Sequence, residues 1–271
     1  MKRDIDCEYY LMDGEVKEFD CPNFDDGKRK IYEVIRLIDG KALFLNEHVE
    51  RLNLSLEKIA SSLKVNRELI ICYLNTLTNG VPVNRNAKLV IIPYEDSLKI
   101  YTYYSKTSYP DQELYSLGVR TGLFKEVREN PNVKTLNMDY KKRLENFKNE
   151  NGIYEAILTD NDDLVTEGSR SNLFFVKGNV VFTPKANKVL MGITRLKVIE
   201  SISNLGLEYK EVDVSVDEIS DFDGAFITGT SIGVMPVHSI DSIVLDSQVN
   251  DTIIKIGSEY ERVVIEDIAN L

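Results

Sequence analysis

Apolar and polar positions form short regular patterns in the first part of the chain. Residues 31–38 (IYEVIRLI) alternate, Asp39-Gly40 follows, and 42–45 is apolar again, which predicts a hairpin around a turn that glycine tolerates. Asn46 is then expected to be the N-cap of a helix. Apolar residues follow it at helical spacing, at Val49, Leu52, Leu56, Ile59 and Leu63. His48, Arg51 and Ser55 share a different face of that helix.

Helices and strands are predicted up to residue 104, after which the chain becomes polar. A second helix is predicted over 68–77, followed by strands at 88–92 and 98–104 that a turn at 93–97 joins. The segment 105–118 is polar and contains one proline and one glycine. It is the best candidate for a linker, and we place the linker itself at 111–118. This divides the chain into an N-terminal domain, 1–110, and a C-terminal domain, 119–271.

The second half is rich in strands that alternate with helices. The predicted strands cover 119–124, 154–159, 172–176, 180–183 and 225–227, and the predicted helices cover 139–149, 194–205 and 249–268. Helices and strands are therefore mixed in both domains. The fold class that this predicts is α+β.

Composition narrows the range of partners. The formal net charge of −11 argues against nucleic acid and anionic membranes, which require clustered Lys and Arg. A small anionic substrate requires only a local basic pocket. The first residues, MKRDIDCEYY, lack an apolar signal region, and no stretch approaches the ~18 apolar residues of a membrane span. We therefore expect a cytoplasmic protein. With three widely spaced cysteines and two histidines, no metal site is predicted.

Two loops are candidates for binding a phosphate. Residues 190–195 (LMGITR) stand at a predicted helix start, where glycine permits close approach and backbone N–H groups point outward. Residues 228–231 (TGTS) follow a predicted strand and carry small hydroxyl side chains. Taken singly, an ordinary capped helix and a polar turn explain the two loops as well. Neither a Walker loop nor GxGxxG is present, so nucleoside triphosphates and dinucleotides are poor candidates.

Two charged residues suggest chemistry. Glu167 stands shortly before the apolar run 173–176, and a carboxylate at the mouth of a buried strand requires a partner, which a protonated ring nitrogen would supply. A solvated turn glutamate accounts for Glu167 equally well. Lys134 lies in NVKTLN. Most lysines are surface charges, but one beside other cations or in an apolar pocket becomes a nucleophile.

Four segments, taken in order, resemble the class IV aminotransferases, the fold-type IV pyridoxal-phosphate family. They are YEVIRLIDGKALFLNEHVERL, VKTLN, EAILTDNDDLVTEGSRSNLFFVKGNVVFTP with VLMGITR, and AFITGTSIGVMPV. The family includes branched-chain aminotransferases, D-amino-acid aminotransferases and aminodeoxychorismate lyases. The resemblance implies a smaller N-terminal α/β domain and a larger, β-barrel-like C-terminal domain with helices. It also implies a homodimer, and the tyrosine-rich segment 94–109 suits either an interface or a cross-strand tyrosine ladder.

The resemblance implies a cofactor, pyridoxal 5′-phosphate, and roles for particular residues. Lys134 is expected to hold the cofactor as a Schiff base and to move the proton of the reaction. Glu167 is expected to pair with the pyridine nitrogen, and Arg51 to reach the phosphate. The other cofactor-binding residues implied are Arg170, Ser171, Asn172, Gly192, Ile193, Thr194, Gly229, Thr230 and Ser231. Tyr32 is expected near the substrate.

The chain departs from the family pattern at four places, one of which is Asn137-Met138, where the family often has an Asn-Tyr pair. The RGxxxGDGxFE-like segment of most members survives only as Tyr32-Glu33. The segment 90–105 lacks the arginine and histidine with which D-specific members bind the substrate carboxylate, and Gly233 replaces a more usual acidic residue. These departures leave open which amino acid is used, and which enantiomer.

Three functions follow as hypotheses. The leading one is amino-group transfer between an amino acid and a 2-keto acid, favoured by the Tyr32-Glu33 pair because lyases tend to have a hydroxyl residue in place of that glutamate. The second is an aminodeoxychorismate lyase that releases pyruvate and 4-aminobenzoate. The third is a non-catalytic paralogue that binds the cofactor without turnover.

Overall fold

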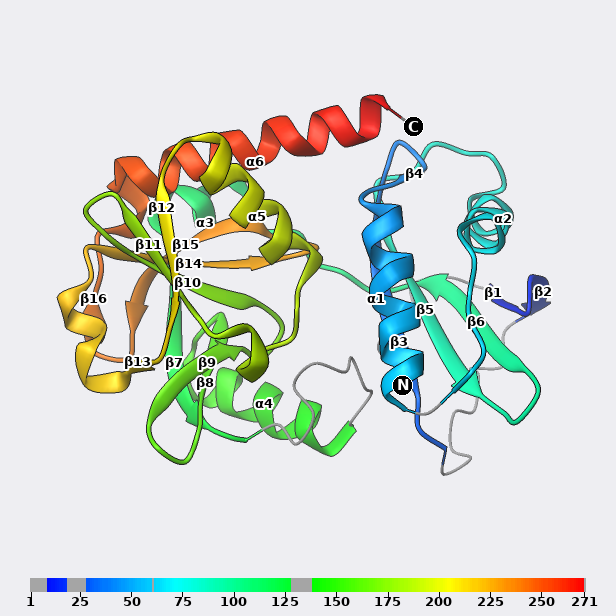
Figure 1. Ribbon diagram of the computed structural model, residues 1–271, viewed down its shortest axis with the longest axis horizontal. Coiled ribbons are helices and arrows are strands. Elements are labelled where there is room, and N and C mark those ends of the chain that lie inside the picture. The colour runs from blue at the N-terminus through cyan, green and yellow to red at the C-terminus, as the bar shows by residue number, and fades with distance from the viewer. Residues whose placement is uncertain (1–8, 19–27, 60, 128–137, 271) are drawn as a thin grey trace. The chain divides into compact units, whose positions relative to one another are not determined.

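The computed structural model describes residues 9–18, 28–59, 61–127 and 138–270 and separates into two compact units (Figure 1). The first unit takes the described residues up to Ser108 together with the end of the chain from Glu266. The second takes the described residues from Tyr109 to Ile265. Helices and large sheets occur together, which confirms the predicted α+β class.

A six-stranded antiparallel sheet forms the frame of the first unit, in the order β2-β1-β6-β5-β3-β4. Its strands are β1 (Tyr9–Met12), β2 (Glu15–Glu18), β3 (Ile31–Ile38), β4 (Lys41–Ala42), β5 (Arg85–Pro93) and β6 (Leu98–Tyr104). Two helices, α1 (Leu45–Lys58) and α2 (Arg67–Thr78), share a core with the sheet (Figure 1). Leu52 and Leu56 of α1 join Ile31 and Ile35 of β3 in that core, as the helical spacing predicts.

Helix α1 begins earlier than the sequence suggests. Its N-cap is Phe44, a buried residue in the left-handed conformation with φ 52°, and Asn46 lies inside the first turn. The Asn46 side chain accepts a hydrogen bond from Arg67 Nε at 2.9 Å instead of capping the helix. The prediction of Asn46 as N-cap is therefore wrong. The physical reason is the short return strand β4, because it leaves the chain at Phe44 already turned into the helix.

A ten-stranded mixed sheet forms the frame of the second unit. Its order is β12-β11-β10-β14-β15-β7-β8-β9-β13, with β16 paired to β15. The strands are β7 (Val119–Lys125), β8 (Glu155–Thr159), β9 (Leu164–Gly168), β10 (Asn172–Lys177), β11 (Val180–Pro184), β12 (Glu208–Val212), β13 (Val214–Ser215), β14 (Gly224–Gly229), β15 (Gly233–Ile240) and β16 (Ile243–Val244). Side chains from β7 to β10 and from β13 to β15 meet in one interior core, which gives the unit a barrel-like character.

Helices cover the outer surface of this sheet. They are α3 (Gln112–Leu117), α4 (Met138–Asn151), α5 (Ile193–Asn204) and α6 (Asp251–Ala269), with short 3₁₀ helices η1 (Ala186–Lys188), η2 (Val216–Asp221) and η3 (Ser247–Val249). Helix α4 lies beside β8 (Figure 1), and its Leu144 packs with Ala156 and Leu158 of β8. Helix α5 lies against β14, where Phe174 and Phe226 stack with ring centroids 4.9 Å apart. Among the described residues, no helix combines the length and apolar character that crossing a bilayer requires.

The stretch 111–118, which we assigned to a linker, holds helix α3 of the second unit. The Asp111 side chain caps the helix by accepting the Leu114 N–H at 3.1 Å. Gly118, with φ 73°, ends it. The Tyr115 hydroxyl donates to the carbonyl oxygen of Ile232 at 2.8 Å. Caps at both ends and this tertiary bond explain why a polar stretch with turn residues is helical here.

Candidate active site

Glu167 is a buried carboxylate near the end of strand β9. Glu167 is only 3% exposed to solvent. Its Oε2 accepts the Leu190 backbone N–H at 2.9 Å and lies 3.5 Å from Asn172 Nδ2. The alternative that Glu167 is a solvated turn residue is therefore wrong. Strand β9 was missed from sequence because its pairing with β8 is irregular between Ile157 and Thr159 and its composition, LVTEG, is only half apolar.

Asn172 joins Glu167 to the loop that precedes helix α5. It is the first residue of β10, and its Nδ2 donates to the Leu190 carbonyl oxygen at 2.8 Å. Its Oδ1 occupies the space that a side chain at position 192 would need, because a Cβ built on Gly192 overlaps it. The glycine at 192 is therefore required by the close approach of Asn172, and the segments 167–172 and 190–192 form one cluster.

The N-terminus of helix α5 follows directly from this cluster. Gly192 is the N-cap, and no side chain of the described residues caps the helix. Ile193 and Thr194 are buried helical residues, so the helix starts one residue before the Thr194 that we expected to open it. The first N–H groups of a helix lack intrahelical acceptors and carry the positive end of its dipole. This end of α5 is suited to an anion.

The second loop predicted to hold phosphate connects β14 to β15. Thr228 lies opposite Asn172 in the β10–β14 register and is 1% exposed. Its neighbours Ala225 and Ile227 point into the interior core, so Thr228 faces the side of the sheet that α5 covers. Among the residues that the structure describes, its Oγ1 has no hydrogen-bond partner. Gly229, Thr230 and Ser231 follow in a half-buried turn.

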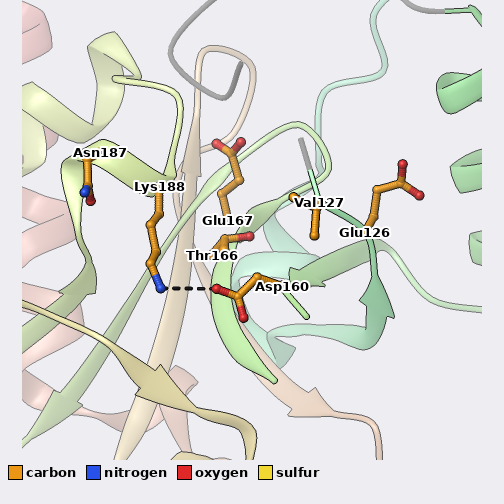
Figure 2. Close-up of a pocket in the computed structure, with 7 residues that line it drawn as sticks. All are labelled: Glu126, Val127, Asp160, Thr166, Glu167, Asn187 and Lys188. Carbon is orange, nitrogen blue, oxygen red and sulfur yellow. Dashed lines mark hydrogen bonds and ion pairs between the residues drawn. The ribbon is translucent and has the colours of Figure 1, made fainter. Parts of the chain in front are cut away.

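A pocket of about 170 Å³ lies beside Glu167 (Figure 2). Its lining consists of Glu126, Val127, Asp160, Thr166, Glu167, Asn187 and Lys188. Figure 2 shows the Lys188 ammonium directed at the Asp160 carboxylate, at 3.1 Å, and it lies equally close to Asp213 Oδ1. Lys185 also pairs with Asp213. Through Asp160 these ion pairs fasten the segment around η1 to the turn between β8 and β9, and through Asp213 they fasten it to the junction of β12 and β13.

The same ion pairs decide the protonation of Lys188. Burial alone would lower the pKa of its ammonium, but the hydrogen bonds to Asp213 and Asp160 outweigh burial and raise that pKa above 10.5. Burial likewise opposes ionisation of Asp160, yet the hydrogen bonds from the Leu164 N–H and Lys188 lower its pKa overall. The hydrogen bonds from Lys185 and Lys188 lower the pKa of Asp213. Lys188 is therefore an ammonium at neutral pH and a poor nucleophile.

The side chains of Arg170 and Ser171 have partners of their own. The Arg170 guanidinium forms an ion pair with Glu145 of α4, and the Ser171 hydroxyl donates to Glu155 Oε2 at 3.2 Å. Glu155 is a second buried glutamate that sequence reasoning missed. A signal was available, because a glutamate opens the otherwise apolar strand 155–159, where a buried carboxylate requires several donors.

Two predicted residues lie in the first unit. Arg51 is buried on α1, and its Nε donates to Glu33 Oε1 at 2.8 Å, while His48 Nδ1 lies 2.7 Å from Glu33 Oε2. Tyr32 lies on the opposite face of β3, where the Lys88 ammonium stands 4.8 Å from its ring centroid. The predicted Lys134 lies outside the described residues. The structure thus gathers Glu167, Asn172, the start of α5 and the β14–β15 loop within the second unit.

Comparisons with known proteins identify the family of the chain. Residues 30–240 match the family model for amino-transferase class IV. The D-alanine aminotransferase of Bacillus licheniformis is 31% identical over 241 residues, which cover 83% of this chain and 82% of that protein. A protein of Rickettsia conorii described as a probable branched-chain-amino-acid aminotransferase is 40% identical over 120 residues, 42% of this chain and 40% of that one.

Solved structures share the fold. The branched-chain amino acid aminotransferase of Escherichia coli superimposes with a TM-score of 0.80 at 20% identity, covering 96% of this chain and 95% of that one. The branched-chain enzyme of Thermobaculum terrenum, solved in its PLP form, gives 0.80 at 19% identity and covers 98% and 95%. At this level of identity the likeness concerns the fold alone, and it confirms the two-domain fold of type IV.

Fold and site together bring a helix start that is suited to an anion close to a buried carboxylate. The chain belongs to the class IV aminotransferases. The resemblance inferred from the four sequence segments is thereby confirmed, and the cofactor of this family is pyridoxal 5′-phosphate.

The described residues fit that cofactor at both ends. The start of α5 and the Thr228 hydroxyl, for which the described part of the chain supplies neither a side-chain cap nor a hydrogen-bond partner, would provide donors for a phosphate. The buried Glu167 carboxylate provides an acceptor for a protonated ring nitrogen. Leu190 links the two ends, since its N–H binds Glu167 two residues before the Gly192 N-cap.

Proposed function

We propose that this chain exchanges an amino group between an amino acid and a 2-keto acid with pyridoxal 5′-phosphate as cofactor. When bound, the cofactor acts as a sink for the electrons that are released at the substrate Cα. The observation that carries the proposal is Glu167, buried and held by Leu190 and Asn172 beside an uncapped helix start. Family membership gives the reaction class.

Glu167 has the task of keeping the ring nitrogen protonated. A carboxylate that is buried and oriented by hydrogen bonds accepts a proton-bearing nitrogen more strongly than a solvated one, because less water competes for it. The Leu190 N–H fixes Oε2, and Asn172 holds the Leu190 carbonyl from the other side. Asn172 therefore orients the acceptor and the phosphate loop together.

The phosphate is held by backbone and hydroxyl donors. We assign to it the N–H groups of Ile193 and Thr194 and the turn Gly229, Thr230 and Ser231. Gly192 admits Asn172 below the loop. The proposal also gives Arg51 to the phosphate and Tyr32 to the substrate, and these two assignments rest on the resemblance of the segment 32–52 to the family.

Lys134 is proposed as the lysine that holds the cofactor and moves the proton. Its segment, VKTLN, supports this through the resemblance alone. The structure supplies a separate argument from elimination. The described lysine in the pocket beside Glu167 is Lys188, and its ion pairs with Asp160 and Asp213 hold it in the protonated form. A lysine that attacks an aldehyde must be neutral.

The proposal extends to the assembly and the location of the protein. A homodimer is expected from the family, and sedimentation of the purified protein as a monomer would contradict it. A cytoplasmic location is proposed as well.

A donor screen tests the proposed function. The purified protein, loaded with pyridoxal 5′-phosphate, is mixed with single L- and D-amino acids in the absence of a keto acid, and the absorbance of the cofactor is followed. We expect at least one donor to convert the cofactor to its amine form. D-alanine and the branched-chain amino acids are tested first, because the relatives described above are a D-alanine aminotransferase and a probable branched-chain-amino-acid aminotransferase.

The same screen separates the alternatives. Pyruvate release from aminodeoxychorismate, with no conversion by any amino acid, would replace the proposal with the lyase. Stable cofactor binding without any reaction would replace it with the non-catalytic paralogue.

A further inference from the structure

The turn that joins β9 to β10 is fastened to a single buried carboxylate. Glu155, at the start of β8, is 4% exposed. Its Oε1 accepts the Ala156 N–H at 2.9 Å and the Ser169 hydroxyl. Its Oε2 accepts the Arg170 N–H and the Ser171 hydroxyl, both at 3.2 Å. Both carboxylate oxygens are therefore used, and three of the four donors come from the turn.

The turn is closed tightly around this carboxylate. A Cβ built on Gly168 overlaps Ser171 Oγ and lies 3.2 Å from the Glu155 Cγ. The Ser169 N–H also donates to the Ala156 carbonyl oxygen at 2.8 Å, which ties the turn to the backbone of β8. While the Ser171 hydroxyl points at Glu155, only glycine fits at position 168, because a Cβ there would overlap that hydroxyl.

The two ends of this turn carry the site. Glu167 stands immediately before Gly168, and Asn172 stands immediately after Ser171. Both side chains bind the backbone of Leu190. Glu167 accepts the Leu190 N–H, and Asn172 donates to the Leu190 carbonyl oxygen. The spacing between these two side chains is therefore set by the conformation of residues 168–171.

We propose that Glu155 is a positioning residue of the cofactor site, which acts through the turn 168–171 to set Glu167 against the ring nitrogen. This inference rests on the proposed function. Charge-assisted hydrogen bonds are about twice as strong as neutral ones, and a carboxylate is an acceptor only. A glutamine at 155 would present an NH₂ group to donors and would release part of the turn.

The proposal also changes the roles of two predicted cofactor ligands. The hydroxyl of Ser171 and the N–H of Arg170 serve Glu155, and the Arg170 guanidinium serves Glu145. In this account they support the site from behind, while Glu167 and Asn172 face the cofactor.

A double-mutant cycle on the full chain tests the proposal. The dissociation constant of pyridoxal 5′-phosphate is measured by equilibrium dialysis for the wild type, Glu155→Gln, Glu167→Gln and the double variant. We expect Glu155→Gln to weaken cofactor binding about tenfold, the effect of losing a hydrogen bond to a charged group. Because Glu155 acts through Glu167, the double variant should bind no more weakly than Glu167→Gln alone.

The absorbance spectrum of the bound cofactor gives a second readout. In the wild type the balance between its protonated and unprotonated forms should change at one pH, and Glu155→Gln should shift that midpoint in the same direction as Glu167→Gln. The matched control is Asp223→Asn. Asp223 accepts the Gly178 N–H at 2.6 Å in another turn of the second unit, and its loss should leave both readouts within twofold of the wild type.

The outcomes separate this inference from the proposed function. If the wild type and Glu167→Gln differ as expected but the effect of Glu155→Gln simply adds to that of Glu167→Gln, Glu155 is structural only and the inference is overturned. If the wild type does not bind pyridoxal 5′-phosphate at all, the proposed function fails first. Should Glu155→Gln fail to fold, Ser171→Ala and Gly168→Ala replace it. Each should weaken binding severalfold and show the same lack of additivity with Glu167→Gln, and additivity in both would overturn the inference.

Discussion

Two buried glutamates, one in each unit, are held in different ways. Glu33 in the first unit is bound by the Arg51 guanidinium and lies beside the His48 ring. Glu167 in the second unit is bound by the Leu190 backbone N–H and lies near the Asn172 amide. The first glutamate forms an ion pair with a guanidinium, and the second accepts a backbone N–H.

The difference is between a carboxylate balanced by a side-chain cation and one oriented by the backbone. An ion pair inside a protein balances its charges, and its removal leaves one charge buried without compensation. A backbone N–H fixes the direction of a carboxylate without cancelling its charge. We therefore expect changes at Glu33 to act chiefly on stability, and changes at Glu167 to act chiefly on the cofactor.

The largest expected effect is that of Glu167→Gln. The variant should keep its fold but lose about a hundredfold in the rate of amino transfer, since a hydrogen bond to a charged group is worth ~1.5–3 kcal/mol. The measurement is the single-turnover rate of the cofactor with a donor found in the screen. A rate within threefold of the wild type would show that Glu167 does not serve the ring nitrogen.

The converse change is Glu33→Gln. It leaves the buried Arg51 without its carboxylate and should lower the free energy of unfolding by about 3 kcal/mol, as measured in urea. The control is Glu208→Gln, which breaks the exposed pair with Lys210 and should change stability by less than about 0.5 kcal/mol. Equal effects of the two variants would remove the contrast between the clusters.

Adding one methyl group at position 192 tests how closely Asn172 packs against the loop before α5. In Gly192→Ala the new Cβ meets Asn172 Oδ1, so we expect cofactor binding to weaken about tenfold. Gly257→Ala in α6 is the matched control, because no described residue outside its own stretch of helix lies within 4 Å of a Cβ at that position. The control should stabilise the protein by up to ~1 kcal/mol through helix propensity. Unchanged cofactor affinity in Gly192→Ala would contradict the close approach of Asn172.

The smallest expected effect concerns the ion pairs beside the pocket. Lys188→Gln should cost at most ~1 kcal/mol of stability near pH 7, because these side chains are partly exposed. The folded-state pKa values of Asp160 and Asp213 are lowered, so their contribution is present above their ordinary value of 3.8 and is lost as the pH falls through the lowered values. The raised pKa of Lys188 keeps its contribution up to at least pH 10.5.

Urea unfolding of the wild type and Lys188→Gln between pH 2.5 and 8 checks this, over a range that begins about one unit below the ordinary carboxyl value. The difference in stability should be constant from neutral pH down to about 5 and should shrink below 3.8. A difference that grows on acidification would contradict the ion pairs.

Local patterns made much of the fold predictable. The alternation over 31–38 gave β3 with the bounds that the structure has, because one face of that strand is buried against α1 and α2. Strand β9 escaped prediction because Thr166, Glu167 and Gly168 are buried by neighbours far away in sequence, which no local pattern reports. The start of α1 depended on a left-handed residue, Phe44, for which propensity gives no signal.

Only part of the candidate site was predictable from the sequence. Sequence motifs indicated Glu167 and the two loops, and the structure brings these together with Asn172. They did not indicate Glu155, since its role appears only when the turn 168–171 folds back on β8. Nor did they indicate that Lys188 shares the pocket with Glu167. The roles of Lys134, Arg51 and Tyr32 stay predictions.

One chemical label tests the central claim most directly. The protein is saturated with pyridoxal 5′-phosphate, reduced with borohydride, digested and mapped by mass spectrometry. The account predicts that the phosphopyridoxyl group is found on Lys134. Its recovery on Lys188, the lysine that lines the pocket beside Glu167, or on no lysine at all would contradict the account.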